Sequence, residues 1–156
     1  MKPKILFILH LPPPIHGAAM MGKYIQESEL VNSSFDCFCI NLATAGSLSD
    51  IGHISLKKLL KYFFLLKHIS HVVREIRPEL VYITPNAGGK AFFKDFIVVQ
   101  MLKSMGCKVI AHYHNKGVSV YQSKWVYNFF YKRFFSNLKV ILLAETLYKD
   151  IAKYVK

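Results

Sequence analysis

Short apolar runs alternate with longer segments of helical periodicity along the whole chain. The first run, residues 4–11, is rich in Ile and Leu and ends in prolines, a pattern typical of a strand that is buried on both faces. Helical spacing of apolar residues follows, and the same alternation continues to the end of the chain. The pattern predicts strands at residues 4–11, 35–42, 80–84, 108–113 and 140–143, and helices at residues 17–28, 56–77, 91–105, 120–135 and 146–155.

This alternation indicates an α/β fold, a Rossmann-like doubly wound parallel sheet in three layers with helices on both faces. Right-handed crossovers favour the strand order 3-2-1-4-5. The first and fourth strands would then be neighbours, and a ligand would bind in the crevice beyond their carboxyl ends. One domain is expected over residues 1–156. Because no stop signal precedes Lys156 in the last predicted helix, we expect this domain to be one lobe of a longer protein.

The composition excludes disorder and points to an anionic partner. Hydrophobic residues make up 53% of the chain and charged residues 19%, too apolar a balance for a disordered protein. The 21 Lys and Arg outnumber the 9 Asp and Glu, and the resulting charge of +12 attracts phosphates, nucleic acid or anionic lipid. No apolar run reaches the roughly 20 residues needed to cross a bilayer. Three cysteines are too few for a disulfide framework and lack zinc spacing, which favours a cytoplasmic protein. Cys37 and Cys39, two residues apart in an apolar run, are expected to be buried.

The loop after the first predicted strand is a candidate anion site. Small residues at Gly17, Ala18 and Ala19, where a helix begins, would let backbone N–H groups approach a phosphate at the positive end of the helix dipole. The alternative is that they only let the helix pack tightly on the strand. His16 beside them is a weaker candidate for hydrogen bonding to a sugar or phosphate. No G-x-G-x-x-G follows the strand, which argues against NAD or FAD. Residues 86–90 predict a turn and a helix start that could touch an acceptor.

A second candidate lies at the end of the fourth predicted strand. His112 and His114 are two residues apart, so both point to the same side while the strand lasts. A metal site is not expected, because zinc needs a third ligand and residues 96–144 contain no acidic residue. We favour a hydrogen bond from one histidine to a sugar or phosphate, with a purely structural histidine as the alternative. Asn115 and Lys116 continue the same loop.

These features together resemble the amino-terminal lobe of family 4 glycosyltransferases, which have the two-lobed GT-B fold. The resemblance covers nearly the whole chain and rests on the first strand with its loop, on the fourth strand ending in His114, and on residues 140–151. It implies that the first loop brings backbone amides toward the donor diphosphate and that the histidine closing the fourth strand contacts the sugars. By position these roles fall on Gly17 and on His114 as the catalytic residue, with the substrate site completed by His16, Ala18, His112, Asn115 and Lys116.

The resemblance implies transfer of a sugar from a nucleotide-sugar donor to an acceptor hydroxyl, in cell-surface polysaccharide or glycolipid synthesis and without a cofactor. The family's donor-binding Glu-x7-Glu pair belongs to the second, carboxyl-terminal lobe, and no two glutamates here have that spacing. This chain alone is therefore expected to be inactive and to supply the side that binds a glycan or lipid-linked acceptor. No nucleic-acid partner is expected. The alternative is a basic Rossmann-like module that binds a small phosphorylated ligand or nucleic acid.

Apolar residues among basic ones also predict peripheral binding to the inner face of the cell membrane. On the helix at residues 56–77, Leu60 and Phe64 fall within the basic face rather than the core face. Trp125 and Phe129 form a second such group near Lys and Arg residues. The alternative is that a crowded core or a second lobe covers these side chains.

Overall fold

The computed structural model describes residues 2–13, 15–42 and 56–155. It divides the chain into two compact units, Met1–Tyr82 and Ile83–Lys156. The strands are β1 (Lys4–Leu9), β2 (Asp36–Asn41), β3 (Leu80–Ile83), β4 (Val109–Tyr113) and β5 (Lys139–Leu142). The helices are α1 (Gly17–Glu27), α2 (Glu29–Ser34), α3 (Leu56–Ile76), α4 (Gly89–Ser104), α5 (Val118–Tyr121), α6 (Trp125–Phe135), the 3-10 helix η2 (Glu145–Leu147) and α7 (Tyr148–Ile151).

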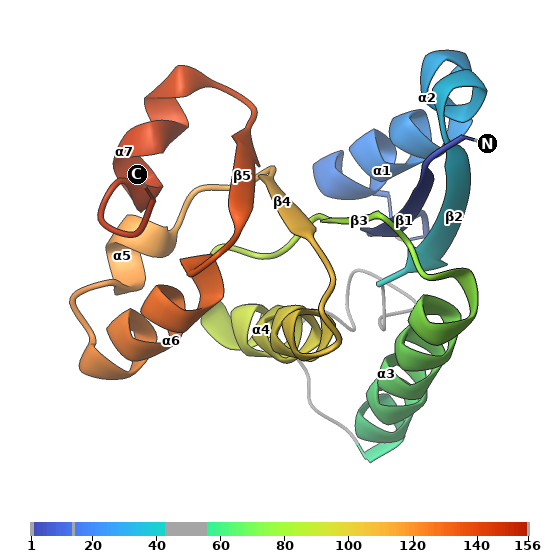
Figure 1. Ribbon diagram of the computed structural model, residues 1–156. Helices are drawn as coiled ribbons and strands as arrows, with labels where there is room; N and C mark the ends of the chain where they lie inside the picture. Colours follow the sequence, from blue (N-terminus) through green and yellow to red (C-terminus); the bar gives the residue numbers. More distant parts are fainter. Residues whose placement is uncertain (1, 14, 43–55, 156) are drawn as a thin grey trace. The chain divides into compact units, whose positions relative to one another are not determined.

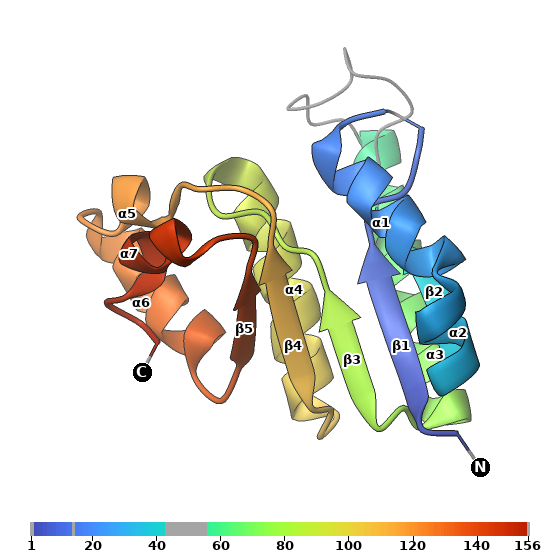
Figure 2. The ribbon, with the colours of Figure 1, turned by 90° about the horizontal axis from the view of Figure 1, so that it is seen from above.

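The predicted fold class is confirmed: the five strands form one parallel sheet flanked by helices, a Rossmann-like α/β arrangement. The strand order is β2-β1-β3-β4-β5. In Figure 2 the arrows of β4 and β5, which pair in parallel, point the same way. Lys4 of β1 pairs in parallel with Asp36 of β2, and Ile110 of β4 with Lys139 of β5.

The predicted strand order 3-2-1-4-5 is wrong. Right-handed crossovers allow a second common doubly wound order, in which the third strand lies on the other side of the first. The two end residues of β2, Asp36 and Asn41, are exposed, which suits a strand at the edge of the sheet with no further strand beside it. Because β3 lies between β1 and β4, the prediction that the first and fourth strands are neighbours is wrong.

In the unit Met1–Tyr82, β1 is the buried centre. Ile5, Phe7 and Leu9 point to one face of β1 and pack with apolar side chains of α1 and α2. Figure 1 shows these two helices on one side of β1 and β2 and α3 on the other. The carboxyl-terminal half of α3 contributes Ile69 and Val73 to the core. The exposed Cys39 on β2 corrects the expectation that the thiols are buried.

In the unit Ile83–Lys156, the core is aromatic. Phe92 of α4 lies at the centre, with its ring 4.6 Å from the ring of Tyr131 and 5.5 Å from that of Phe134, both on α6. Tyr113 of β4 stacks on Phe135, with 5.9 Å between ring centroids. The two helices and β4 are therefore joined through ring contacts, which fixes the carboxyl end of β4 relative to α4 and α6.

Several predicted helices differ from the observed ones. The helix expected at residues 120–135 is two helices, α5 and α6, because the backbone of Lys124 is extended (φ −77°, ψ 122°). The last helix, expected at residues 146–155, ends at Ile151. Among the described residues, no helix is both long and apolar enough to cross a lipid bilayer.

Candidate functional site

His112 and His114 lie together at the carboxyl end of β4, with 4.2 Å between their ring centroids. Both side chains are partly buried. Burial, and to a smaller extent the neighbouring His114, lower the pKa of His112 to about 4. Burial also lowers the pKa of His114 from its usual value. Both imidazoles are therefore neutral at physiological pH, and each presents one donor and one acceptor nitrogen.

The two ring nitrogens of His114 are buried and have no hydrogen-bond partner among the described residues. Buried polar atoms in proteins are nearly always paired, because an unpaired one costs about 1–3 kcal/mol. An exception in a partly open position at the end of a parallel strand is typical of a group that a ligand or an ordered water completes. His114 is thus the strongest single candidate for a ligand contact.

Asn115 and Tyr131 hold the loop after β3 from two sides. The Asn115 side-chain oxygen accepts a hydrogen bond from the backbone N–H of Ala87 at 3.1 Å. The Tyr131 hydroxyl donates to the carbonyl oxygen of Ala87 at 2.6 Å. The residue next to His114 therefore ties the loop after β4 to the loop after β3. Gly88 has no room for a Cβ atom because the Tyr121 ring lies against it.

Asp95, which is buried in α4, holds Asn86, the residue before Ala87 in the loop after β3. Its carboxylate accepts hydrogen bonds from the backbone N–H of Asn86 at 2.7 Å and from the Asn86 side-chain amide at 2.8 Å. Burial raises the pKa of Asp95 to about 6, although the two hydrogen bonds and Lys94 act in the opposite direction. The loop after β3 is thus held at Asn86 by a buried carboxyl group.

Asp150 of α7 plays the same part for the loop after β4. Its carboxylate accepts hydrogen bonds from the backbone N–H groups of Gly117 (2.9 Å), Val118 (2.9 Å) and Ser119 (3.0 Å), and from the Ser119 hydroxyl. Burial alone would raise the pKa of Asp150, but these hydrogen bonds outweigh it and the pKa is lowered. A carboxylate of the chain therefore already occupies the amides that this loop could have offered to a phosphate. Lys116, one residue earlier, is exposed.

The loop after β1 has a different construction. His16 caps α1, since its Nδ1 accepts a hydrogen bond from the backbone N–H of Ala19 at 3.3 Å. Gly17 is exposed, and a Cβ atom built on it would meet no atom of the described residues within 4 Å, so close packing does not explain this glycine. Ala19, in contrast, is fully buried, as the packing alternative expects. Ala18 beside it is partly buried. Close packing occurs instead at Gly22, where a Cβ atom would collide with the carbonyl of His10.

The predicted site residues thus fall into two groups. His112, His114, Asn115 and Lys116 lie together at the end of β4 in one unit. The other group stands at the start of α1 in the other unit: His16, Gly17 and Ala18. Sequence reasoning missed Asp95, Tyr131 and Asp150. An available signal was that Asp95 is an acidic residue inside an aromatic and aliphatic helix, in a chain with 9 acidic residues in all.

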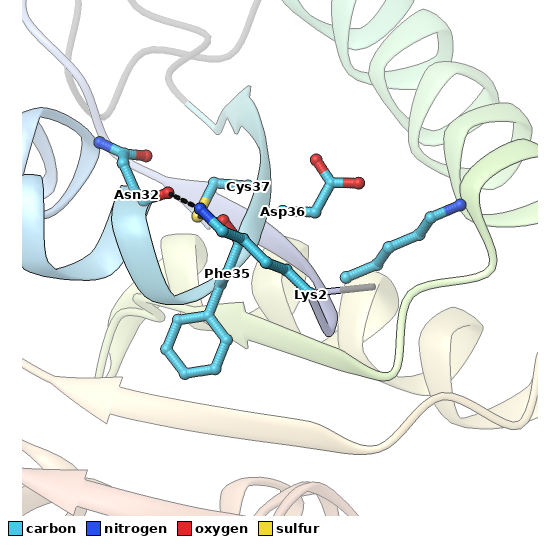
Figure 3. A pocket seen from close by; sticks show the side chains of 6 residues that line it. Lys2, Asn32, Phe35, Asp36 and Cys37 are labelled. Carbon is cyan, nitrogen blue, oxygen red and sulfur yellow. Dashed lines mark hydrogen bonds between the residues drawn. The ribbon is translucent and has the colours of Figure 1, made fainter.

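A shallow pocket at the opposite, amino-terminal ends of β1 and β2 is not part of this site. It is lined by Lys2, Lys4, Asn32, Phe35, Asp36 and Cys37. Figure 3 shows the Lys2 amino group turned to the backbone oxygen of Asn32, to which it donates at 3.2 Å. Ligands of parallel α/β sheets bind at the carboxyl ends of the strands, so we do not assign a function to this pocket.

Within the described part of the chain, no three His, Cys, Asp or Glu side chains are grouped so that they could hold a metal ion. Comparison of the chain with known protein families, with curated proteins and with solved structures finds no match. The fold class therefore follows from the structure, and function is inferred from the site.

Proposed function

We propose that this chain is the amino-terminal, acceptor-side domain of a glycosyltransferase of the family 4 type, which moves a sugar from a nucleotide-sugar donor to an acceptor hydroxyl. The reaction would belong to cell-surface polysaccharide or glycolipid synthesis. The observation that carries the proposal is His114, a neutral histidine with two unpaired buried ring nitrogens at the end of β4. The resemblance assigns a sugar-contacting histidine to this position.

A neutral imidazole suits a sugar ligand. Each sugar hydroxyl both donates and accepts hydrogen bonds, and the ring of His114 offers one donor and one acceptor. With its pKa lowered by burial, the ring stays uncharged and can accept a proton from an acceptor hydroxyl. The hydrogen bonds of Asn115, Tyr131 and Asp150 hold the adjacent backbone, so this contact would be preorganised.

Backbone amides and basic side chains can stabilise the departing diphosphate without a metal ion. Gly17 supports this part of the proposal, because it is exposed at the start of an 11-residue helix and no side chain of the described residues crowds it. Lys116 is exposed and can move toward an anion. The donor itself would be held by a second, nucleotide-sugar-binding domain.

The same proposal locates the protein at the inner face of the cell membrane, as a cytoplasmic protein that binds peripherally and takes a glycan or lipid-linked acceptor. The four side chains that the sequence singled out are exposed: Leu60 at 52%, Phe64 at 65%, Trp125 at 81% and Phe129 at 52%. None is packed in the core of its own unit. This exposure supports membrane binding over burial in a crowded core.

A transfer assay tests the proposal. The product of the whole reading frame and the 156-residue chain would each be incubated with labelled UDP-glucose, UDP-N-acetylglucosamine or GDP-mannose and a lipid extract as acceptor. We expect transfer only by the longer product, which should contain a Glu-x7-Glu pair in a second α/β domain. His114→Ala should lower kcat by about 100-fold, and His71→Ala, a change at an exposed histidine of α3, should not.

Three results would contradict the proposal. Transfer by the 156-residue chain alone would refute the two-domain account. A parental rate for a folded His114→Ala variant would make His114 a structural residue. Binding of oligonucleotide that collapses with salt, without sugar transfer by any form, would favour the alternative of a basic binding module.

A further inference from the structure

The two halves of α3 expose different kinds of side chain. In the carboxyl-terminal half, the exposed residues are polar or charged: His68, His71, Arg74 and Glu75. In the amino-terminal half, five large apolar side chains are exposed: Leu56, Leu59, Leu60, Phe63 and Phe64. One helix therefore changes from an ordinary surface helix to one that presents apolar groups to solvent.

Two of the exposed apolar side chains, those of Leu60 and Phe64, are not an extension of the core face. Ile69 and Val73 mark the core face, since they are the buried residues of α3. At about 100° per residue, Leu60 and Phe64 point roughly 180° away from these two residues. Figure 1 shows the amino-terminal end of α3 reaching away from the strands of its unit, whereas the carboxyl-terminal end lies beside them. Leu60 and Phe64 are thus directed outward.

Basic residues lie among the exposed apolar side chains, and no acidic residue of α3 lies in this half of the helix. Lys57, Lys61 and Lys67 are exposed on the same half, and no Asp or Glu occurs from residue 51 to residue 74. The Lys67 amino group lies 4.8 Å from the centre of the Phe63 ring, so cation and ring share one surface. We call this surface, formed by residues 56–67, the α3 face.

We infer that the α3 face docks on an anionic lipid bilayer, lying in the interface with its Leu and Phe side chains in the acyl region and its lysines at the headgroups. An occupant must accept apolar side chains and compensate several positive charges with no acidic residue to help. An anionic bilayer does both, because its headgroups are negative and its interior is apolar. A second copy of the chain would bring the same lysines together, and their repulsion argues against self-association through this face.

This inference rests on the membrane part of the proposed function and makes it specific. Residues 56–67 span about 18 Å along the helix axis, enough for three turns in the plane of the interface. Docking through α3 needs neither a donor nor transfer activity. Binding to vesicles can therefore fail while transfer is observed, or succeed while transfer is not.

Vesicle flotation with the 156-residue chain tests the inference. We would compare phosphatidylcholine vesicles with vesicles that contain roughly 30% phosphatidylglycerol, at about 0.15 M salt. The parent chain should bind the anionic vesicles at least tenfold more tightly, and Leu60→Ser with Phe64→Ser should reduce this binding at least tenfold. Replacing Lys57 and Lys61 by Gln should reduce it by about tenfold or more, since each basic residue near an anionic surface contributes about fivefold.

The control is Tyr24→Ser with Leu30→Ser, which removes two exposed large side chains from α1 and α2 without changing the charge. It should bind like the parent, and circular dichroism should show every variant folded. Equal, negligible binding of the parent to both kinds of vesicle would overturn the inference. That result is also the one expected if the α3 face binds an acidic protein instead of a membrane. Full binding by the Leu60 and Phe64 variant would also overturn it, as would a dimer of the parent that this variant abolishes without any vesicle binding.

Discussion

The loop after β1 and the loops after β3 and β4 occupy equivalent places at the ends of parallel strands but are built differently. After β1, the candidate residue Gly17 is exposed and uncrowded, and the histidine next to it is used as a helix cap. After β3 and β4, buried carboxyl groups and a tyrosine hold the backbone, and the histidine is left with two unpaired nitrogens. In the sequence, the loop after β1 and the loop after β4 each contain a histidine and small residues.

The difference shows that residue type does not decide whether a histidine is available to a ligand. The Nδ1 of His16 accepts a hydrogen bond from the N–H of Ala19, whereas the ring nitrogens of His114 have no such partner among the described residues. A ligand contact works best when its surroundings are already fixed. We therefore place more weight on the end of β4 than on the start of α1, and the following predictions test that contrast.

The largest effect is expected from Asp150→Ala. The substitution leaves three backbone N–H groups and the Ser119 hydroxyl without the carboxylate that they share in a buried place. The free energy of unfolding, measured in urea, should fall by about 3 kcal/mol. Asp36→Ala, at an exposed aspartate of β2, should change it by less than about 0.5 kcal/mol. Equal effects of the two substitutions would show that Asp150 does not hold the loop.

Asp95 should produce a pH dependence of stability that Asp95→Asn removes. Its pKa is raised to about 6 in the folded chain, from 3.8, so the folded state binds the proton more tightly than the unfolded state. The stabilising contribution is complete below pH 3.8 and is lost as the pH rises through about 6. The loss amounts to about 2–3 kcal/mol for a shift of about two units.

The measurement for Asp95 is urea unfolding at several pH values, with parent and variant compared. The pKa of Asp150 is lowered, so its own contribution is lost only as the pH falls below 3.8, outside this window. His112 and His114, whose pKa values are lowered, also titrate in this window, but they do so equally in parent and variant, so the difference between the two curves reports Asp95. The same pH dependence of parent and Asp95→Asn between pH 4 and 6 would contradict the burial of Asp95.

Two glycines of α1 should separate packing from exposure. Gly22→Ala places a Cβ atom against the carbonyl of His10 and should lower the free energy of unfolding by about 2 kcal/mol. Gly17→Ala meets open space and should change it by about 0.5 kcal/mol at most. Thermal unfolding of the two variants decides the point, and the reverse ranking would mean that Gly17 has a packing role.

The smallest effect is expected from Tyr131→Phe. The ring contacts of Tyr131 remain, but its hydrogen bond to the carbonyl oxygen of Ala87 is lost. The free energy of unfolding should fall by about 1 kcal/mol. Phe130→Leu, beside it on α6, would serve as a control for general sensitivity of this helix. An unchanged stability of Tyr131→Phe would indicate that the loop after β3 is held without this bond.

The sequence predicted the α/β class and every strand to within about two residues, because β1 and β4 are continuous apolar runs between turn signals. It did not predict the position of β3, since alternation and crossover handedness allow both strand orders. The polar ends of β2, Asp36 and Asn41, were the available sign of an edge strand.

The candidate site was predictable only in part. The spacing of His112 and His114 placed both rings at one strand end, as observed. The bonds of Asp95 and Asp150 to the two loops span 9 and 33 residues at their longest, and no local pattern encodes such partners. The sequence did not predict that His16 caps α1, because histidine is an uncommon N-cap residue and its ring could equally have faced a ligand.

The central claim is that the two histidines at the end of β4 are neutral and that the ring nitrogens of His114 are available to a ligand. Nitrogen-15 NMR of the imidazole rings in the 156-residue chain, recorded through a pH titration, tests this claim most directly. We expect His112 to protonate at about pH 4 and His114 below its usual value of 6.5, and the nitrogen shifts of His114 to show no hydrogen bond to the protein. Protonation of His114 at or above 6.5, or a hydrogen bond from its ring to the chain, would contradict the account.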